Sequence, residues 1–129
     1  MIEIKKIIVV VLIIAPSIFS QEAPEWRYLT EWWFWEYYYD ELSVKYDEDH
    51  FFVNVKETRI MLGKDTEKGK EVDHYIYNFK IWCNGKYEII AKATYFKNGS
   101  MNYDKENWKS PKAIQSQSMP YALLKLCRE

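Results

Sequence analysis

The fold follows from one stretch of the chain, Tyr75-Ile76-Tyr77-Asn78-Phe79-Lys80-Ile81-Trp82-Cys83. Its odd positions are apolar or aromatic, whereas Asn78 and Lys80 occupy even positions. Alternation with a period of two is typical of a strand that buries one face. The next segment, Tyr87 to Tyr95, repeats the pattern with charged residues at even positions. We therefore expect two neighbouring strands whose odd-numbered faces both lie on the core.

The turn between these strands has a length that the alternation predicts. Asn84-Gly85 is typical of a two-residue hairpin turn, but such a turn would place Ile81 opposite Glu88 and join a core face to a polar face. A three-residue loop over residues 83–85, with a left-handed glycine, instead places Ile81 opposite Tyr87. We expect the longer loop.

The same reasoning extends the sheet in both directions. A three-residue loop over residues 97–99 pairs Tyr95 with Met101 and again keeps like faces together. Upstream, runs rich in aromatic and β-branched residues predict strands at residues 26–30, 37–40 and 51–60. Residues 62–73 are rich in glycine and charge, which predicts a mobile hairpin loop.

Near the C-terminus the pattern changes from strand to helix. Ser118 can accept a hydrogen bond from the first free amide groups, and Pro120 is tolerated in a first helical turn. Tyr121 and Leu124 then share a face of a helix that ends near Cys127. The sequence thus predicts an α+β domain, an antiparallel sheet of about six strands with one C-terminal helix.

The first 20 residues have the layout of a signal peptide. Lys5 and Lys6 precede the apolar run 7–14, and Ser20 stands at a cleavage-like end. The apolar run is shorter than the roughly 20 residues that span a bilayer. We therefore expect residues 1–20 to be removed and residues 21–129 to form a single exported domain without a membrane span, in the periplasm, at the cell surface or in the medium.

The chain contains two cysteines, Cys83 and Cys127. In an oxidising compartment two cysteines permit one intramolecular pairing, so we expect a Cys83–Cys127 disulfide that ties the helix back to the sheet. A metal site needs more ligands than His50 and His74 supply, since neither lies at short spacing from a cysteine. We expect neither a metal nor another cofactor.

Charge and motifs argue against two classes of function. The chain has 18 Lys and Arg against 19 Asp and Glu, and nucleic-acid binding usually needs a basic face. His50 and His74 each follow an aspartate, but no nucleophile accompanies either, and no hydrolase, zinc-protease or nucleotide-binding motif occurs. We expect no nucleic-acid partner, no catalytic residues and no enzyme activity.

The aromatic block Trp32-Trp33-Phe34-Trp35 is the sharpest functional candidate. In a strand the block would place aromatic rings on both faces of the sheet. Because a thin single-sheet domain can bury only one face well, part of the block should be exposed or covered by a partner. Exposed aromatic patches often mark binding sites. We expect the block to bind a protein partner or a second copy of the chain in a homodimer, with ordinary packing and sugar stacking as alternatives.

The order of several residues around the two cysteines resembles the surface-adhesin protein E family of bacterial exported proteins. The residues that carry the resemblance are Trp26, Tyr38-Tyr39-Asp40, Cys83, Tyr87, Tyr95, Asn98-Gly99, Trp108, Ser110-Pro111, Ser118 and Cys127. The resemblance covers nearly all of residues 21–129 and implies about six antiparallel strands, a C-terminal helix tied back by the disulfide and a non-enzymatic role in binding host extracellular-matrix proteins. Residues 31–36 depart from the family pattern, and the resemblance transfers no matrix-binding residue.

The sequence therefore predicts an exported, adhesin-like binding protein whose partner is a protein of the host matrix or the cell envelope. One alternative is a periplasmic carbohydrate or small-ligand binding module that uses Trp32, Trp33 and Trp35. The other is an inhibitor of a cell-envelope hydrolase that presents the loop at residues 62–73.

Overall fold

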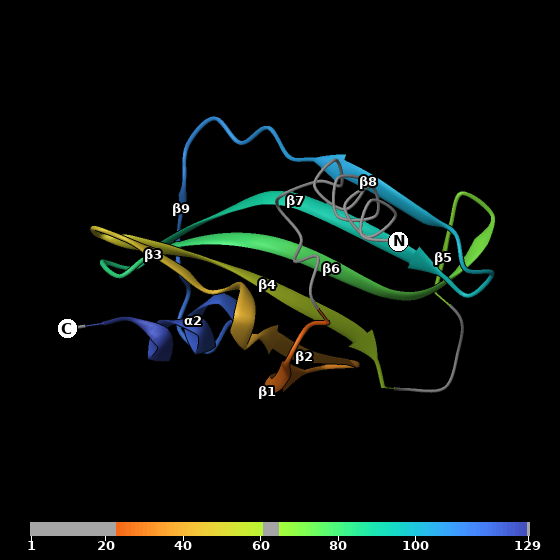
Figure 1. Cartoon of the computed structure of the whole chain (residues 1–129), viewed down its shortest axis with the longest axis horizontal. Coiled ribbons are helices and arrows are strands. Elements are labelled where there is room, and N and C mark those ends of the chain that lie inside the picture. Colours follow the sequence, from red (N-terminus) through yellow and green to blue (C-terminus); the bar gives the residue numbers. More distant parts are fainter. Residues whose placement is uncertain (1–22, 61–64, 129) are drawn as a thin grey trace, which may run out of the picture.

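The structure is a computed structural model that describes residues 23–60 and 65–128. An antiparallel sheet of nine strands makes up most of it (Figure 1). Six strands form its main order β1-β2-β4-β6-β7-β8, with the bounds β1 (Trp26–Trp32), β2 (Trp35–Asp40), β4 (His50–Arg59), β6 (Lys70–Trp82), β7 (Lys86–Phe96) and β8 (Met101–Lys105).

Three short strands pair beside this main order. They are β3 (Lys45–Asp47) on β4, β5 (Thr66–Glu67) on β6 and β9 (Lys112–Ala113) on β7. The expected sheet of about six strands is therefore right for the main order and too small for the whole, because pairs of two or three residues leave little alternation to read in a sequence. The antiparallel sheet with one short C-terminal helix is confirmed.

Both predicted three-residue loops are present. Ile81 pairs with Tyr87 across the first loop, and Tyr95 pairs with Met101 across the second. The glycines that close the loops have positive φ values, +101° at Gly85 and +90° at residue 99. A left-handed residue at the end of a three-residue hairpin loop lets the strands keep their right-handed twist.

The predicted alternation fails in the second half of β7. Phe79 pairs with Ile89, but Asn78 pairs with Ala91, so Ile90 is an extra residue in the ladder. Such a bulge moves every later side chain to the other face. Ala91 therefore shares a face with Asn78 and not with Phe79. The expectation that all odd positions from 87 to 95 share one face is wrong beyond residue 89, although Ala91 and Ala93 are themselves fully buried.

The segment 62–73 was expected to be a mobile hairpin loop, and its described part contains a tight β-hairpin turn flanked by strands. Residues 61–64 lie outside the described residues. Glu67 pairs with Lys70 across the two-residue turn Lys68-Gly69, and β6 begins immediately after that turn. Both turn residues have positive φ values, +53° and +75°, as a tight hairpin turn requires. A hairpin is present as expected, and its loop is shorter than expected because residues 66–67 and 70–73 lie in strands.

The C-terminal segment forms a shorter helix than expected. The α2 helix (Met119–Leu123) is followed by a 3₁₀ turn, η2 (Leu124–Leu126). Ser118 caps α2, because its hydroxyl accepts a hydrogen bond from the amide of Tyr121. The predicted disulfide joins Cys83 to Cys127, with 5.9 Å between the Cα atoms. It fastens the end of this short segment to the β6–β7 loop.

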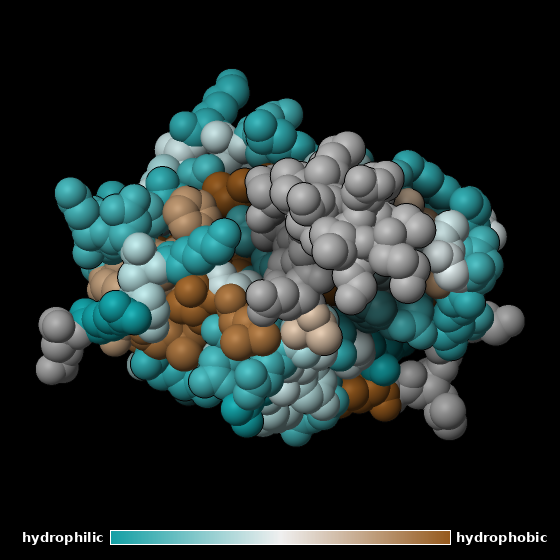
Figure 2. Space-filling view, in the orientation of Figure 1, coloured by the Kyte–Doolittle hydropathy of each residue, from teal (hydrophilic) through white to brown (hydrophobic). Residues whose placement is uncertain are grey.

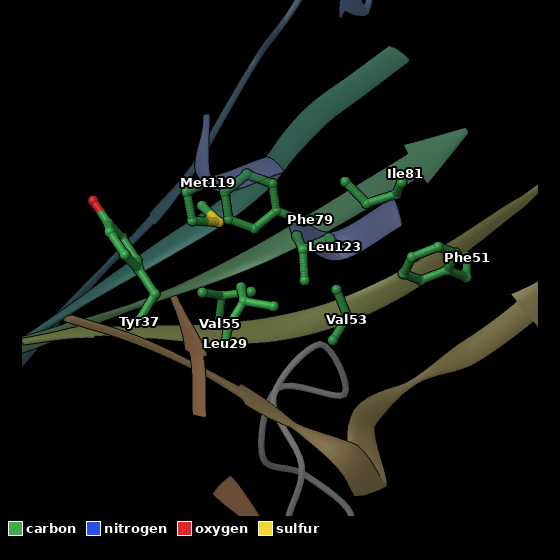
Figure 3. Packing of buried hydrophobic residues seen from close by; sticks show 9 residues of the cluster. All are labelled: Leu29, Tyr37, Phe51, Val53, Val55, Phe79, Ile81, Met119 and Leu123. Atoms are coloured by element: carbon green, nitrogen blue, oxygen red, sulfur yellow. The ribbon is translucent and has the colours of Figure 1, made fainter. Parts of the chain in front are cut away.

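The core lies between the sheet and α2 (Figure 3). Phe51, Ile81 and Leu123 have no exposed surface. The full cluster is Leu29, Tyr37, Phe51, Val53, Val55, Phe79, Ile81, Met119 and Leu123. Met119 and Leu123 on α2 face Phe79 on β6 in the close view (Figure 3). The helix therefore covers one end of this sheet face.

The predicted signal peptide at residues 1–20 lies outside the described residues. Within residues 23–60 and 65–128, no helix is long and apolar enough to cross a membrane.

A second 3₁₀ turn, η1 (Glu41–Ser43), joins β2 to β3. Asp40 is buried there and holds the turn, because its carboxylate accepts hydrogen bonds from the amides of Glu25 and Leu42.

Candidate functional site

The aromatic block forms the tip of the β1–β2 hairpin. Trp32 ends β1 and pairs with Trp35, which begins β2, so Trp33 and Phe34 are the turn. Trp33 has a φ of +57°, an uncommon backbone conformation for a bulky residue. The carbonyl oxygen of Phe34 accepts a hydrogen bond from the amide of Ile60 at 2.9 Å, which links the turn to the end of β4.

Three aromatic side chains at this tip are exposed to solvent. The exposed fractions are 53% for Trp32, 72% for Trp33 and 41% for Phe34, and we call these three residues the tip cluster. The ring of Trp33 meets Trp32 edge to face at 6.3 Å and Phe34 at 6.2 Å. The ring of Trp33 is thus steeply tilted against both neighbouring rings.

Trp35 belongs to the same block of sequence and has a different environment. Its ring lies 6.2 Å from the ring of Tyr75 and is covered by the guanidinium of Arg59 at 5.7 Å. It packs against the core cluster and against a second buried cluster formed by Val72, Tyr75 and Phe96. The structure therefore brings Trp32, Trp33 and Phe34 together at the surface, whereas Trp35 is a partly buried side chain packed against the clusters.

The outer face of the same hairpin carries four further residues, of which the sequence analysis noted only Tyr38, as part of the family resemblance. We call Tyr28, Glu31, Glu36 and Tyr38 the outer hairpin face. Tyr28 pairs with Tyr38, and Glu31 pairs with Glu36 on the next row of that face. The two tyrosine rings meet edge to face at 5.9 Å. Only the register of the hairpin places the two carboxylates opposite each other, so strand pairing had to be known first.

Electrostatics tie these four residues together. The hydroxyl of Tyr38 donates a hydrogen bond to the carboxylate of Glu36. This bond raises the pKa of Tyr38 above its ordinary value. Partial desolvation and then the negative charges of Glu31 and Glu36 raise the pKa of Tyr28. The tyrosines stay protonated, and the negative charge of this face comes from the two glutamates.

A second acidic group lies inside the sheet, on the face that α2 covers further along. Glu57 on β4 stands between Tyr37 on β2 and Tyr75 on β6. Its carboxylate accepts a hydrogen bond from the hydroxyl of Tyr77 at 3.2 Å. Burial raises the pKa of Glu57, while the hydroxyls of Tyr37 and Tyr77 oppose that rise. This group can hold a proton at a higher pH than an exposed glutamate.

The two histidines each pair with a neighbouring aspartate and not with the tip cluster. Nδ1 of His50 lies 2.9 Å from a carboxylate oxygen of Asp49, and Nδ1 of His74 lies 2.7 Å from Asp73. His74 also stacks on the ring of Tyr95 at 4.6 Å. Within the described ranges, no group of three or more His, Cys, Asp or Glu side chains could hold a metal ion.

A shallow pocket of about 430 Å³ lies at the opposite end of the sheet from the tip cluster. Residues 46–50, Cys83, Asn84 and Arg128 line it. The Arg128 guanidinium stacks over the ring of Tyr46 at 3.6 Å and covers that aromatic face. No residue of the aromatic block lines this pocket, so the tip cluster is a protruding surface and not part of this cavity.

The hydropathy of one face of the molecule varies from one element to the next (Figure 2). On the face drawn in Figure 2, hydrophobic residues gather over α2 and η1, and most of the remaining outline is hydrophilic. Residues of intermediate hydropathy lie over β1 and β2. Trp and Tyr have an apolar ring and one polar group, which suits them to surfaces that are wet when free and buried when bound.

Comparison with known proteins adds no relative of this chain. No protein-family model matches it, and no match was found among curated proteins or solved structures. The resemblance to the surface-adhesin protein E family, which was noted from individual residues, stays a prediction.

Proposed function

We propose that this chain is an exported, non-enzymatic binding protein, adhesin-like in role, which engages a protein partner through the tip cluster. The observation that carries the proposal is the exposure of Trp32, Trp33 and Phe34 together at the end of one hairpin. Large aromatic side chains with little rotamer entropy to lose dominate the energetics of many protein interfaces. The predicted partner is a protein of the host matrix or the cell envelope.

Export is part of the proposal and has three supports. The sequence of residues 1–20 has the layout of a secretory leader. The disulfide between Cys83 and Cys127 is a bond that persists in oxidising compartments. The resemblance to exported adhesins of bacteria points in the same direction.

Ring geometry favours a protein over a sugar as the partner. Sugar-binding surfaces stack flat pyranose faces on aromatic faces, and extended sugars need rings in a common plane. The ring of Trp33 is tilted by 74° from that of Trp32 and by 67° from that of Phe34. Such a wedge fits an irregular apolar pocket on a protein better than it fits a glycan chain.

A pull-down tests this proposal. The exported protein, with its disulfide intact, is immobilised and exposed to cell-envelope and host-matrix extracts beside a Trp33→Ser variant. Tyr121→Ser is the matched control, because Tyr121 is also an exposed aromatic residue but lies on α2. We expect a partner that is retained by the native protein and the control and lost with Trp33→Ser. Equal retention by all three proteins would contradict the proposal.

A further inference from the structure

Positively charged side chains cover aromatic rings in many parts of this sheet. The pairs include Lys56 over Trp26 and Tyr38, Lys80 over Trp82, Lys92 over Tyr75 and Lys112 over Trp108, at 4.5 to 5.3 Å from the ring centroids. Ring faces are electrostatically negative and attract such cations. In this domain a lysine or arginine side chain therefore commonly lies over an aromatic ring of the sheet.

Tyr28 and the tip cluster of the β1–β2 hairpin do not follow this pattern. Among the described residues, no lysine or arginine lies over Tyr28 or over the rings of the tip cluster. Tyr28 is nevertheless 53% exposed. These rings are therefore left available to a cation that another molecule supplies.

The same end also carries negative charge without an internal counter-ion. Glu31 and Glu36 stand directly opposite each other, an arrangement that like charges make unfavourable. In the part of the chain that the structure describes, neither carboxylate forms an ion pair. By contrast Glu25 and Glu41, at the other end of the hairpin, share Arg27 between them.

Lys56 shows that this face of the sheet accommodates an ammonium group. Its Nζ atom lies 4.8 Å from the ring of Trp26 and 5.3 Å from the ring of Tyr38. Tyr38, Lys56 and Tyr28 share one row of the sheet, and Glu31 with Glu36 forms the next row toward the tip. Lys56 therefore occupies the row with Tyr28 and Tyr38, and the two carboxylates without an ion pair occupy the next row.

We propose that the outer hairpin face is a docking site for a lysine or arginine side chain of the protein partner. The ring of Tyr28 and the carboxylates of Glu31 and Glu36 receive the cation, while the tip cluster contacts apolar groups beside it. This inference rests on the proposed function and names the chemistry of the partner: a basic residue that flanks an apolar segment.

An NMR titration with three short peptides tests the inference on the exported, disulfide-bonded protein. The peptides alternate glycine with lysine, with glutamine or with glutamate. We expect the lysine peptide to bind and to shift the amide signals of Tyr28, Glu31, Glu36 and Tyr38. The double variant E31Q/E36Q keeps side-chain shape and the Tyr28 ring and removes both charges. It should weaken lysine-peptide binding about tenfold, as the loss of two surface ion pairs at the upper end of their usual range allows.

The matched control is E48Q/E106Q, which removes the same charge at exposed or half-exposed sites away from the hairpin. We expect its affinity for the lysine peptide to change less than about twofold, as screened long-range charge effects do. Equal weakening in both double variants, or equal binding of the glutamine peptide, would overturn the inference. So would signal shifts confined to the acidic pocket around residues 46–50.

The peptide titration and the pull-down fail in different ways. If the lysine peptide does not bind and Trp33→Ser still loses its partner, the basic-residue inference is wrong and the binding function stands. If Trp33→Ser retains every captured protein, the proposed function is wrong whatever the peptides do.

Discussion

Aromatic side chains at the two ends of one sheet have opposite environments. Beneath α2, Phe51 and Phe79 have at most 2% of their surface exposed. At the tip of the β1–β2 hairpin, Trp33 is 72% exposed. The first end is closed by a helix that a disulfide holds in place, and among the described residues nothing closes the second. The comparison teaches that hydrophobicity alone does not assign an aromatic residue to the core, because strand pairing and coverage decide its place.

Removing a ring from the closed end should have the largest effect on stability. Phe79→Ala deletes a buried side chain and leaves a cavity that the sheet cannot fill. We expect the free energy of unfolding to fall by about 3 to 5 kcal/mol, measured by urea unfolding. A loss below 1 kcal/mol would contradict the assignment of this end as the core.

Releasing the C-terminal segment should have the next largest effect. Cys127→Ser breaks the bond to Cys83 and frees the unfolded chain, so we expect a loss of about 2 to 4 kcal/mol. Mass spectrometry of the non-reduced native protein should show the Cys83–Cys127 cross-link. Two free thiols in that experiment would contradict the closure of this end by the helix.

The loop that joins β6 to β7 offers a smaller effect. Gly85 has a φ of +101°, and a Cβ atom added there would meet nothing within 4 Å. Gly85→Val therefore tests backbone strain without a steric clash, and we expect a loss of about 1 to 2 kcal/mol. Gly85→Asn is the control, because asparagine tolerates the left-handed region and should cost less. Equal stability of the valine variant and the native protein would contradict the left-handed loop.

The pH dependence of stability tests the burial of the Glu57 carboxylate. Because burial raises the pKa of Glu57 above the ordinary value of 4.5, folding takes up a proton at this group. Its effect on stability is most favourable below the unfolded pKa and is lost as the pH rises through the folded pKa. Glu57→Gln should therefore match the native protein in acid and become relatively more stable as the pH rises toward neutrality.

Urea unfolding at a series of pH values measures this difference. Glu48→Gln serves as the control, because Glu48 is exposed in the turn between β3 and β4. Its stability relative to the native protein should not change with pH in the same direction. A Glu57→Gln curve that runs parallel to the native curve would contradict the burial of this carboxylate.

The closed end could largely be predicted from the sequence, because its rules are local. Alternation in residues 75–83 and the left-handed Gly85 fix the register that pairs Ile81 with Tyr87. The bulge at Ile90 could not be predicted in this way. Ile90 is an ordinary strand residue, so neither its type nor the pattern around it marks the extra residue in the ladder. Beyond that point local alternation assigns side chains to the wrong face.

The hairpin end could be predicted only in part. The block Trp32 to Trp35 was recognisable as aromatic on both faces, but Trp33-Phe34 contains none of the glycine or asparagine residues that mark a tight turn. Without that turn, the pairing of Glu31 with Glu36 has no basis. The outer hairpin face was missed because its four residues come together only through the register of two strands.

Hydroxyl-radical footprinting of the disulfide-bonded protein tests the contrast between the two ends most directly, because it reads the solvent access of individual side chains. We predict rapid oxidation of Trp32, Trp33 and Phe34 and slow oxidation of Phe51 and Phe79, with Trp35 between them. Protection of the tip cluster to the level of Phe51 and Phe79 in the free monomer would contradict the account, because a buried tip has no aromatic surface to offer a partner.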